Sequence, residues 1–191
     1  MKKNLSDYVA ITKNAISDDL CDLVVQELEA SPNWRPHTFT KFVDGQLMEF
    51  TSPKDPNQHD PTLPTVMPAL MKIYWDAVYK YIDKDTGYKW FTSWQGFSPL
   101  KFIQYNPETE MRIHCDHIHS VFDGYKKGIP ILTILGQFNN NFKGGELVLF
   151  EDEVIPFDKG DVIVFPSNFL FPHTIQNITE GVRYSAAAWV F

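Results

Sequence analysis

The densest group of metal-ligand side chains in this 191-residue chain lies around residue 115. His114 and Asp116 are two residues apart, and on a β-strand this spacing places both side chains on one face. A neutral imidazole and a carboxylate on one wall can bind a single metal ion from one side. The pair alone is a weak signal, because the same tripeptide also arises on exposed strands with two solvated side chains.

A third ligand has to come from elsewhere in the fold. His173 is the candidate, because the remaining histidines lie in the N-terminal half or beside the motif. Two histidines and one carboxylate form the open-sided triad that is typical of non-haem Fe(II) oxygenases. We therefore predict that His114, Asp116 and His173 are the metal ligands.

Arg183 follows His173 by ten residues, with an expected turn between them. If residues 171–176 and 182–190 pair as a hairpin, Arg183 and His173 become cross-strand neighbours with Cβ atoms about 5–8 Å apart. Ser185 then lies on the same face as Arg183. A guanidinium and a hydroxyl beside a metal can bind one end of a dicarboxylate whose other end binds the metal.

Further motifs accompany these residues over the second half of the chain. They are Tyr105 nine residues before His114, Gly144-Gly145-Glu146-Leu147, Gly160-Asp161 before an apolar strand, and Arg183-Tyr184-Ser185 before Trp189 and Phe191. In this order and spacing, from about Leu100 to Phe191, the motifs resemble those of 2-oxoglutarate- and Fe(II)-dependent oxygenases of the prolyl 4-hydroxylase type. Glu108 stands where the family pattern has glycine, so we expect that loop to differ in shape.

The resemblance implies an activity and a set of residue roles. The implied enzyme is a dioxygenase that uses Fe(II), 2-oxoglutarate and O2, with ascorbate as reductant. It would hydroxylate a prolyl residue of a peptide or protein and release succinate and CO2. His114, Asp116 and His173 would hold the iron, and Arg183 would bind the distal carboxylate of 2-oxoglutarate. Four more residues are expected to contact the cosubstrate: Tyr105, Ser185, Gln137 and Thr133.

Asp116 also bears on the outcome of the implied reaction. A related halogenase branch has a small residue at this position, so an aspartate there favours hydroxylation. The same chemistry also fits free proline or another small molecule as the substrate.

A different class of protein is suggested by the histidines that follow the motif. His117 and His119 have the His-x-His spacing of a cupin metal site. A non-catalytic, cupin-like metal-binding module is therefore an alternative, although it leaves Arg183 without a role. We expect both histidines to lie in a loop at the mouth of the site, and residues 119–128 to be a candidate lid over the substrate.

The elements that must position these residues change in character near residue 96. Residues 1–95 are predicted to form a helical and loop support region, with helices at about 17–31 and 65–82. Residues 96–191 contain about eight short β-rich runs separated by Gly, Pro and Asn. This pattern predicts a double-stranded β-helix (jelly-roll) as the catalytic core, and hence a mainly β, α+β fold with helical N-terminal support.

Length and composition limit the possible functions. The length supports one domain over residues 1–191 with a substantial hydrophobic core. The chain has 24 acidic and 17 basic residues, and its formal charge is −7. Such an excess of acidic residues does not favour general binding to nucleic acid or anionic lipid, and it disfavours nucleic-acid demethylation as the function. The chain has only two cysteines, and no apolar stretch follows the first lysines, so we expect a cytoplasmic protein. It also has no apolar run long enough to cross a membrane, so we expect no membrane span.

Overall fold

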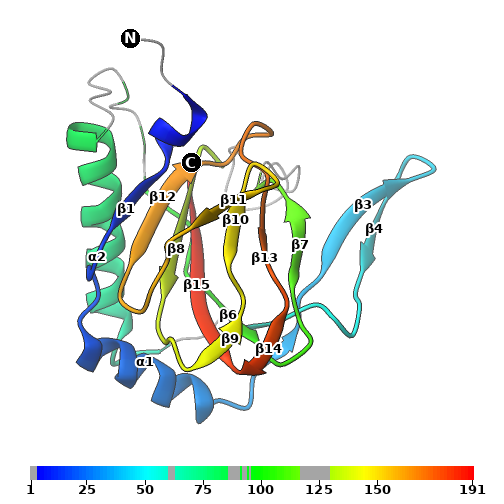
Figure 1. Cartoon of the computed structure of the whole chain (residues 1–191), viewed down its shortest axis with the longest axis horizontal. Coiled ribbons are helices and arrows are strands. Elements are labelled where there is room, and N and C mark those ends of the chain that lie inside the picture. The colour runs from blue at the N-terminus through cyan, green and yellow to red at the C-terminus, as the bar shows by residue number, and fades with distance from the viewer. Residues whose placement is uncertain (1–3, 60–62, 86–90, 92–93, 95, 117–129) are drawn as a thin grey trace.

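The structure is a computed structural model, and it describes residues 4–59, 63–85, 91, 94, 96–116 and 130–191. The candidate lid and the two histidines His117 and His119 lie outside these residues. The described chain forms two facing antiparallel sheets, with helices on the outer side of one of them (Figure 1).

The larger sheet has seven strands in the order β1-β12-β8-β15-β6-β5-β2. They are Ala10–Thr12 (β1), Val162–Pro166 (β12), Leu132–Gln137 (β8), Arg183–Val190 (β15), Lys101–Tyr105 (β6), Asn57–His59 (β5) and Arg35–Pro36 (β2). All neighbours run antiparallel. Alternate side chains of the central strands therefore point to opposite faces, one toward the helices and one toward the smaller sheet.

The smaller sheet has four strands in the order β11-β10-β13-β7. They are Glu153–Ile155 (β11), Leu147–Leu149 (β10), His173–Ile175 (β13) and Met111–His114 (β7). One buried apolar cluster joins the two sheets, and its members include Ile103, Tyr105, Ile163 and Phe165 from the larger sheet and Met111, Leu147, Leu149 and Ile175 from the smaller one. The two sheets thus form the double-stranded β-helix that the strand pattern predicted.

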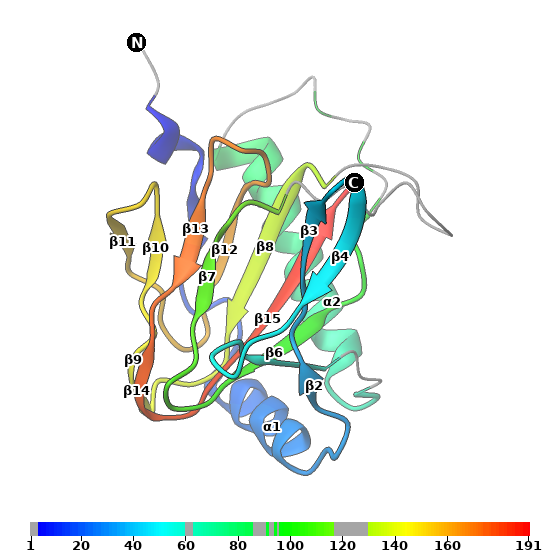
Figure 2. The ribbon, with the colours of Figure 1, turned by 90° about the vertical axis from the view of Figure 1, so that its right-hand side faces the viewer.

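Two further strand pairs complete the β structure. Phe142–Gly144 (β9) pairs with Ile178–Gly181 (β14), and Phe39–Val43 (β3) pairs with Gln46–Phe50 (β4). The β3–β4 hairpin extends away from the body of the molecule (Figure 1). It follows β2, which is an edge strand of the larger sheet (Figure 2).

The helices pack on the outer face of the larger sheet (Figure 2). Helix α1 (Asp18–Glu29) begins at Ser17, whose hydroxyl accepts a 3.3 Å hydrogen bond from the Leu20 amide, as an N-cap does. Helix α2 (Met67–Lys80) continues into a π-helical turn, Tyr81–Asp85 (η2), and a short 3-10 helix, Leu5–Tyr8 (η1), precedes β1. None of the helices among the described residues has both the length and the apolar character that a membrane crossing requires.

Helix α2 approaches β8 and β15 very closely. The Tyr74 hydroxyl donates a 3.2 Å hydrogen bond to the Ala186 carbonyl of β15. A Cβ atom added at Gly136 of β8 would clash with this hydroxyl and lie 3.1 Å from Tyr74 Cζ. Glycine is required at this point because it leaves room for the tyrosine ring.

The N-terminal region differs from the expectation of helices and loops alone. Both expected helices are present, but the region also contributes β1, β2 and β5 to the two edges of the larger sheet, together with the β3–β4 hairpin. These strands are only two to five residues long. Alternation of apolar and polar residues is not visible over such short lengths, so the sequence pattern did not reveal them.

The predicted hairpin of residues 171–176 and 182–190 is wrong. Strand β13 lies in the smaller sheet, whereas β15 lies in the larger one. The segment expected to be the turn forms β14 instead, and the chain leaves it through Gly181, whose φ is +75°. Strand patterns locate strands along the chain but do not say which sheet each one joins. His173 and Arg183 therefore lie on facing sheets rather than on neighbouring strands.

The loop at Glu108, where the family pattern has glycine, crosses from β6 in the larger sheet to β7 in the smaller one. Glu108 has a φ of +67°, the left-handed region that favours glycine. Two backbone hydrogen bonds hold the loop against β14: from the Glu108 amide to the Ile178 carbonyl, 2.8 Å, and from the Ile178 amide to the Thr109 carbonyl, 3.0 Å. The position therefore has a glycine-type backbone conformation although it carries a glutamate.

Candidate active site

The three predicted metal ligands converge at one end of the smaller sheet. His114 ends β7 and pairs directly with His173 at the start of β13, and their ring centroids are 4.4 Å apart. Asp116 follows β7, with Oδ1 3.4 Å from His114 Nε2 and Oδ2 3.6 Å from His173 Nε2. One ligand atom from each residue lies within 4.8 Å of the others. This spacing suits a single ion bound from one side.

Backbone carbonyls orient both imidazoles. His114 Nδ1 is 2.7 Å from the Arg112 carbonyl oxygen, and His173 Nδ1 is 3.2 Å from the Phe171 carbonyl oxygen. Because a carbonyl oxygen only accepts, each Nδ1 carries the proton and donates it. Each Nε2 is then left with a lone pair that faces the other ligands, which is the usual arrangement of metal-binding histidines.

The charges of the triad match this arrangement. Burial lowers the pKa of His173, which keeps that ring neutral. Burial also acts to lower the pKa of His114, but the hydrogen bond and negative charge of Asp116 outweigh it, and the net shift is upward. Burial alone would raise the pKa of the Asp116 carboxyl, yet His173, His114 and a hydrogen bond from Thr133 hold this pKa well below its usual range. Asp116 is therefore ionised, as a ligand must be.

Arg183 is a buried cation on the facing sheet. Its side chain is among the largest that are fully buried in the protein. Its Nη1 donates a 3.2 Å hydrogen bond to Ser185 Oγ, and its Cζ lies 4.9 Å from the centre of the Tyr105 ring. No carboxylate in the described part of the chain forms an ion pair with it. Because an uncompensated buried charge is costly, the position is suited to an anion from outside the chain.

The predicted cosubstrate residues surround this guanidinium on the larger sheet. Tyr105 is paired with Arg183 across β6 and β15, and Gln137 is paired with Ser185 across β8 and β15. Burial raises the pKa of Tyr105 to about 12 although Arg183 opposes the shift, so the phenol stays protonated and can donate a hydrogen bond. Gln137 Nε2 donates to the Asn139 carbonyl, while its buried Oε1 has no hydrogen-bond partner in the described structure.

Thr133 takes a different position from the other predicted cosubstrate residues. Its Oγ1 donates a 2.7 Å hydrogen bond to Asp116 Oδ2 and is 2.9 Å from Ser167 Oγ. The structure thus places Thr133 behind the metal ligands. Ser167 was not identified from the sequence, because a serine after a strand carries no distinctive signal.

The second glycine of the Gly144-Gly145 motif is explained by its backbone conformation and by its closeness to Arg183. Gly145 has a φ of +72°, and a Cβ atom added there would clash with Ile178 and lie 3.2 Å from Arg183 Cδ. A residue with a side chain would therefore be strained and would crowd the stem of the guanidinium.

Residues from outside the motifs line the approach to the triad. The Phe39 ring at the start of β3 lies 6.0 Å from the His114 ring, and the Arg112 guanidinium stacks over Phe39 at 4.3 Å. Arg112 Nη2 also forms a 2.9 Å ion pair with buried Asp55. Trp189 lies on the same face of β15 as Arg183, and its buried Nε1 has no partner among the described residues. Trp189 belongs to the C-terminal motif, whereas the sequence gave no signal for Phe39 or Asp55.

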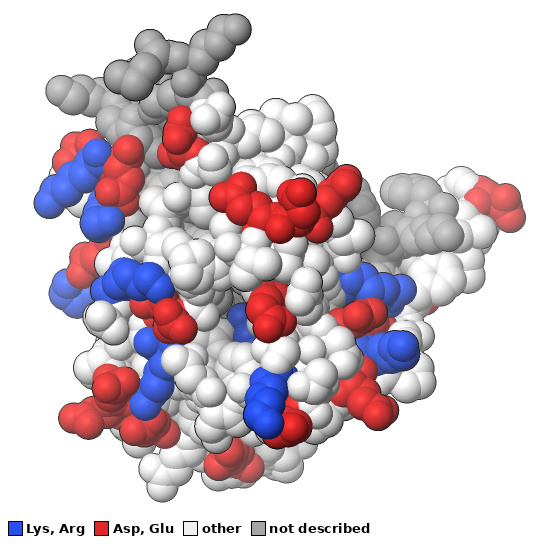
Figure 3. Space-filling model, in the orientation of Figure 1, with Lys and Arg blue, Asp and Glu red and all other residues white. Residues whose placement is uncertain are grey.

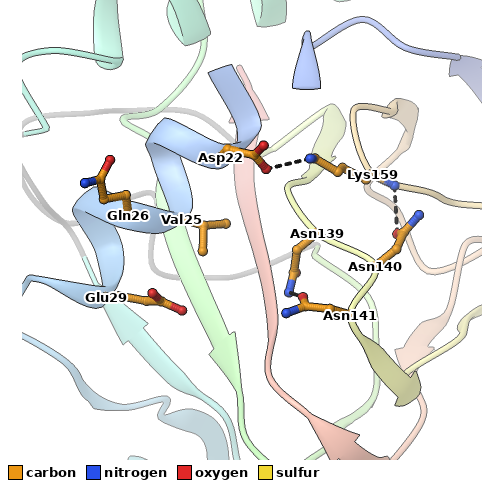
Figure 4. Close-up of a pocket in the computed structure, with 8 residues that line it drawn as sticks. All are labelled: Asp22, Val25, Gln26, Glu29, Asn139, Asn140, Asn141 and Lys159. Carbon is orange, nitrogen blue, oxygen red and sulfur yellow. Dashed lines mark hydrogen bonds and ion pairs between the residues drawn. The ribbon is translucent and has the colours of Figure 1, made fainter. Parts of the chain in front are cut away.

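A separate polar pocket lies between α1 and the connection from β8 to β9 (Figure 4). Its polar groups are largely paired with one another: Lys159 Nζ contacts Asp22 at 2.5 Å, and the Lys159 amide donates to Asn140 Oδ1 at 2.8 Å. The lining residues are Asp22, Val25, Gln26, Glu29, Asn139, Asn140, Asn141 and Lys159. None of the predicted site residues lines this pocket, so it is not the candidate active site.

Comparison with known proteins agrees with this geometry. Residues 100–191 match the family model of the 2OG-Fe(II) oxygenase superfamily. A PKHD-type hydroxylase of Rippkaea orientalis is 37% identical over 94 residues, which is 48% of this chain and 41% of that protein. The chain thus spans less than half the length of the curated relatives it matches.

Solved structures share the fold over nearly the whole chain. A prolyl-4-hydroxylase from Pseudomonas putida has a TM-score of 0.67 and 17% identity, and the match covers 96% of this chain and 91% of that one. A prolyl hydroxylase from Trichoplax adhaerens, solved with a hypoxia inducible factor peptide fragment, has a TM-score of 0.71 and 17% identity, covering 97% and 84%. At this level of identity the likeness concerns the fold.

The residues present fit the cofactors that the family name implies. Two imidazole Nε2 atoms and an ionised carboxylate suit Fe(II), and a buried guanidinium that has no counter-ion among the described residues suits the free carboxylate of 2-oxoglutarate. The matched motifs, the shared fold and this donor set lead to one conclusion. Residues 100–191, just under half of the chain, are similar to the 2OG-Fe(II) oxygenase superfamily.

Proposed function

We propose that this protein is a Fe(II)- and 2-oxoglutarate-dependent dioxygenase that hydroxylates a prolyl residue of a peptide or protein. One observation carries the proposal: an open-sided His/Asp/His set lies opposite a buried guanidinium on the facing sheet, and no described residue is a counter-ion to that guanidinium. His114, Asp116 and His173 would hold Fe(II), and Arg183 would bind the distal carboxylate of 2-oxoglutarate. When bound, iron and cosubstrate supply the oxidation in which O2, 2-oxoglutarate and a substrate C–H give C–OH, succinate and CO2.

The protein's own side chains would bind and orient the cosubstrate. Arg183 would neutralise the distal carboxylate, and the Ser185 and Tyr105 hydroxyls lie beside it as further donors. All three are buried, which strengthens these charge-assisted hydrogen bonds because water does not screen them. Gln137 offers an additional polar contact on the neighbouring strand.

The substrate assignment rests on weaker support than the reaction type. The structural relatives include prolyl hydroxylases, one of them solved with a peptide. The Phe39 ring lies 6.0 Å from the His114 ring, and Trp189 is in register with Thr133 on the neighbouring strand; such aromatic side chains suit an apolar proline ring. On the face shown in Figure 3, basic side chains are interspersed with acidic ones rather than gathered in a patch, which favours a peptide over nucleic acid.

The proposal also covers the organisation and location of the protein. We propose that residues 1–191 act as one domain, with 1–95 as support and 96–191 as catalytic core. Buried side chains of α1 and α2 share a core with those of β6, β8 and β12, which supports this organisation. Both cysteines are free thiols, which supports work in a reducing, cytoplasmic compartment.

The test of the proposed reaction is a turnover assay. Purified protein with Fe(II), ascorbate and 2-oxoglutarate is expected to form succinate slowly, and faster with a proline-containing peptide that gains the mass of one oxygen atom. A peptide library is compared with free proline and other amino acids, and Asp116→Ala protein is the blank.

Each other result of this assay has a defined meaning. Oxygen gain by free proline alone would replace the peptide with a small-molecule substrate. Metal binding without 2-oxoglutarate binding or succinate would identify a non-catalytic, cupin-like module and overturn the oxygenase proposal.

A further inference from the structure

Two buried hydroxyl groups lie in line behind the Asp116 carboxylate. Thr133 Oγ1 is 2.7 Å from Asp116 Oδ2, and Ser167 Oγ is 2.9 Å from Thr133 Oγ1. Thr133 and Ser167 are both completely buried, and Asp116 is 4% exposed. Bulk water therefore does not compete for these hydrogen bonds.

The direction of the two hydrogen bonds follows from the contacts themselves. Thr133 Oγ1 donates its single hydroxyl proton to Asp116 Oδ2. Its oxygen can then only accept from Ser167, whose hydroxyl must be the donor of the second bond.

The two hydroxyls are held by the most regular part of the larger sheet. Thr133 lies on β8 and is in register with Phe165 on one neighbouring strand and Trp189 on the other. Ser167 follows β12 directly, and its amide donates a 2.9 Å hydrogen bond to the Ile131 carbonyl. Asp116 lies beyond the end of β7, so its side chain depends on contacts from outside its own strand.

We propose that Ser167 and Thr133 are positioning residues that set the orientation of the Asp116 carboxylate for the metal. The hydrogen bond from Thr133 occupies one lone pair of Oδ2 and fixes the carboxylate plane. This favours attachment of the metal through one carboxylate oxygen and keeps positions open for cosubstrate and O2. The proposal rests on the proposed function, since it assumes that the triad holds the metal.

The experiment measures Co(II) binding to the purified protein and five variants. Thr133→Val removes the hydroxyl at nearly constant volume and is expected to weaken Co(II) binding about 10–100-fold, the effect typical of partners that orient a metal ligand. Thr133→Ser keeps the hydroxyl and is expected to restore most of the affinity. Ser167→Ala is expected to weaken binding about 5-fold, because it removes one hydrogen bond from the line.

Thr109→Val is the matched control. Thr109 is also buried, and its hydroxyl donates to the Asn106 carbonyl rather than to a ligand. This variant should bind Co(II) as the wild type does. Thermal unfolding of the metal-free proteins compares their stabilities, and the visible absorption of bound Co(II) should change in Thr133→Val and Ser167→Ala but not in Thr109→Val.

The double variant Thr133→Val/Ser167→Ala tests whether the two hydroxyls act in series. It should bind Co(II) no more weakly than Thr133→Val alone, because Ser167 acts only through Thr133. Two results would overturn the positioning role but not the proposed function. One is that the losses of Co(II) affinity in the two single variants add up in the double variant. The other is that Thr133→Val has the Co(II) affinity and absorption of the wild type. A wild-type protein that binds no Co(II) would overturn the proposed function and this inference with it.

Discussion

The two facing sheets hold their functional groups in different ways. On the smaller sheet, His114 lies on edge strand β7 with a side chain that is 25% exposed. Its ring is oriented by a carbonyl only two residues away. On the larger sheet, Arg183, Ser185 and Tyr105 lie on interior strands and are buried. Arg183 contacts Ser185 along β15 and Tyr105 across to β6.

The predicted metal ligands and the residues around Arg183 are therefore held in place by different kinds of contact. Each predicted metal ligand is oriented by a single nearby group: a backbone carbonyl two residues away for each imidazole, and the Thr133 hydroxyl for the Asp116 carboxylate. The group around Arg183 instead depends on the register of three strands that are far apart in sequence, β6, β8 and β15. The proposed metal position is therefore more accessible than the proposed cosubstrate position. Apart from Thr133 and Ser167, which contact Asp116 from the larger sheet or its end, substitutions on the two sheets should affect binding of different ligands.

The largest expected effect is loss of metal binding in Asp116→Ala. Removing the only carboxylate of the triad leaves two neutral imidazoles, and Fe(II) or Co(II) affinity should fall by at least about 100-fold, beyond the range seen for residues that only orient ligands. Titration calorimetry with Co(II) measures this. His119→Ala is the control and should keep the metal. Metal loss in that control instead would show that the ligands are assigned wrongly.

A smaller and different effect is expected for Arg183→Leu. Loss of a charge-assisted hydrogen-bonding pair should raise the 2-oxoglutarate requirement about 10–100-fold and leave metal affinity unchanged. The metal-free variant should also be more stable, because the buried cation has no counter-ion in the described structure. The melting temperature with and without 2-oxoglutarate separates the two effects.

Arg112→Leu is the matched control for this comparison. Arg112 is half-exposed and already paired with Asp55, so its loss should not change the 2-oxoglutarate requirement. Equal effects of the two arginine variants would mean that the two sheets do not have separate roles.

The smallest effect is expected at the crossing between the sheets. Glu108→Gly should stabilise the protein by about 1 kcal/mol, because glutamate is strained at a φ of +67° and glycine is not. Glu110→Gly, two residues later and outside the positive-φ set, should destabilise it by about 0.5–1 kcal/mol. Urea unfolding measures both changes. A destabilised Glu108→Gly protein would show that the glutamate side chain makes a compensating interaction.

The sequence predicted what depends on local spacing. The convergence of His114 and Asp116, the two helices and most core strands followed from residue spacing and periodicity, although Asp116 lies just beyond the end of β7. The pairing of β13 was predicted wrongly, because strands adjacent in sequence join different sheets in this fold. Ser167 and Phe39 reach the site only through tertiary packing, and no local pattern marks such residues.

The close fit of α2 against β8 extends the region on which activity depends. Gly136 has no room for a methyl group because the Tyr74 hydroxyl occupies that space. The same strand carries Thr133 and Gln137 toward the opposite side of the sheet. Through Tyr74, helix α2 thus fixes the position of β8, although none of the predicted site residues lies on this helix. Random mutagenesis for altered turnover should therefore recover changes in α2 as well as in the motifs.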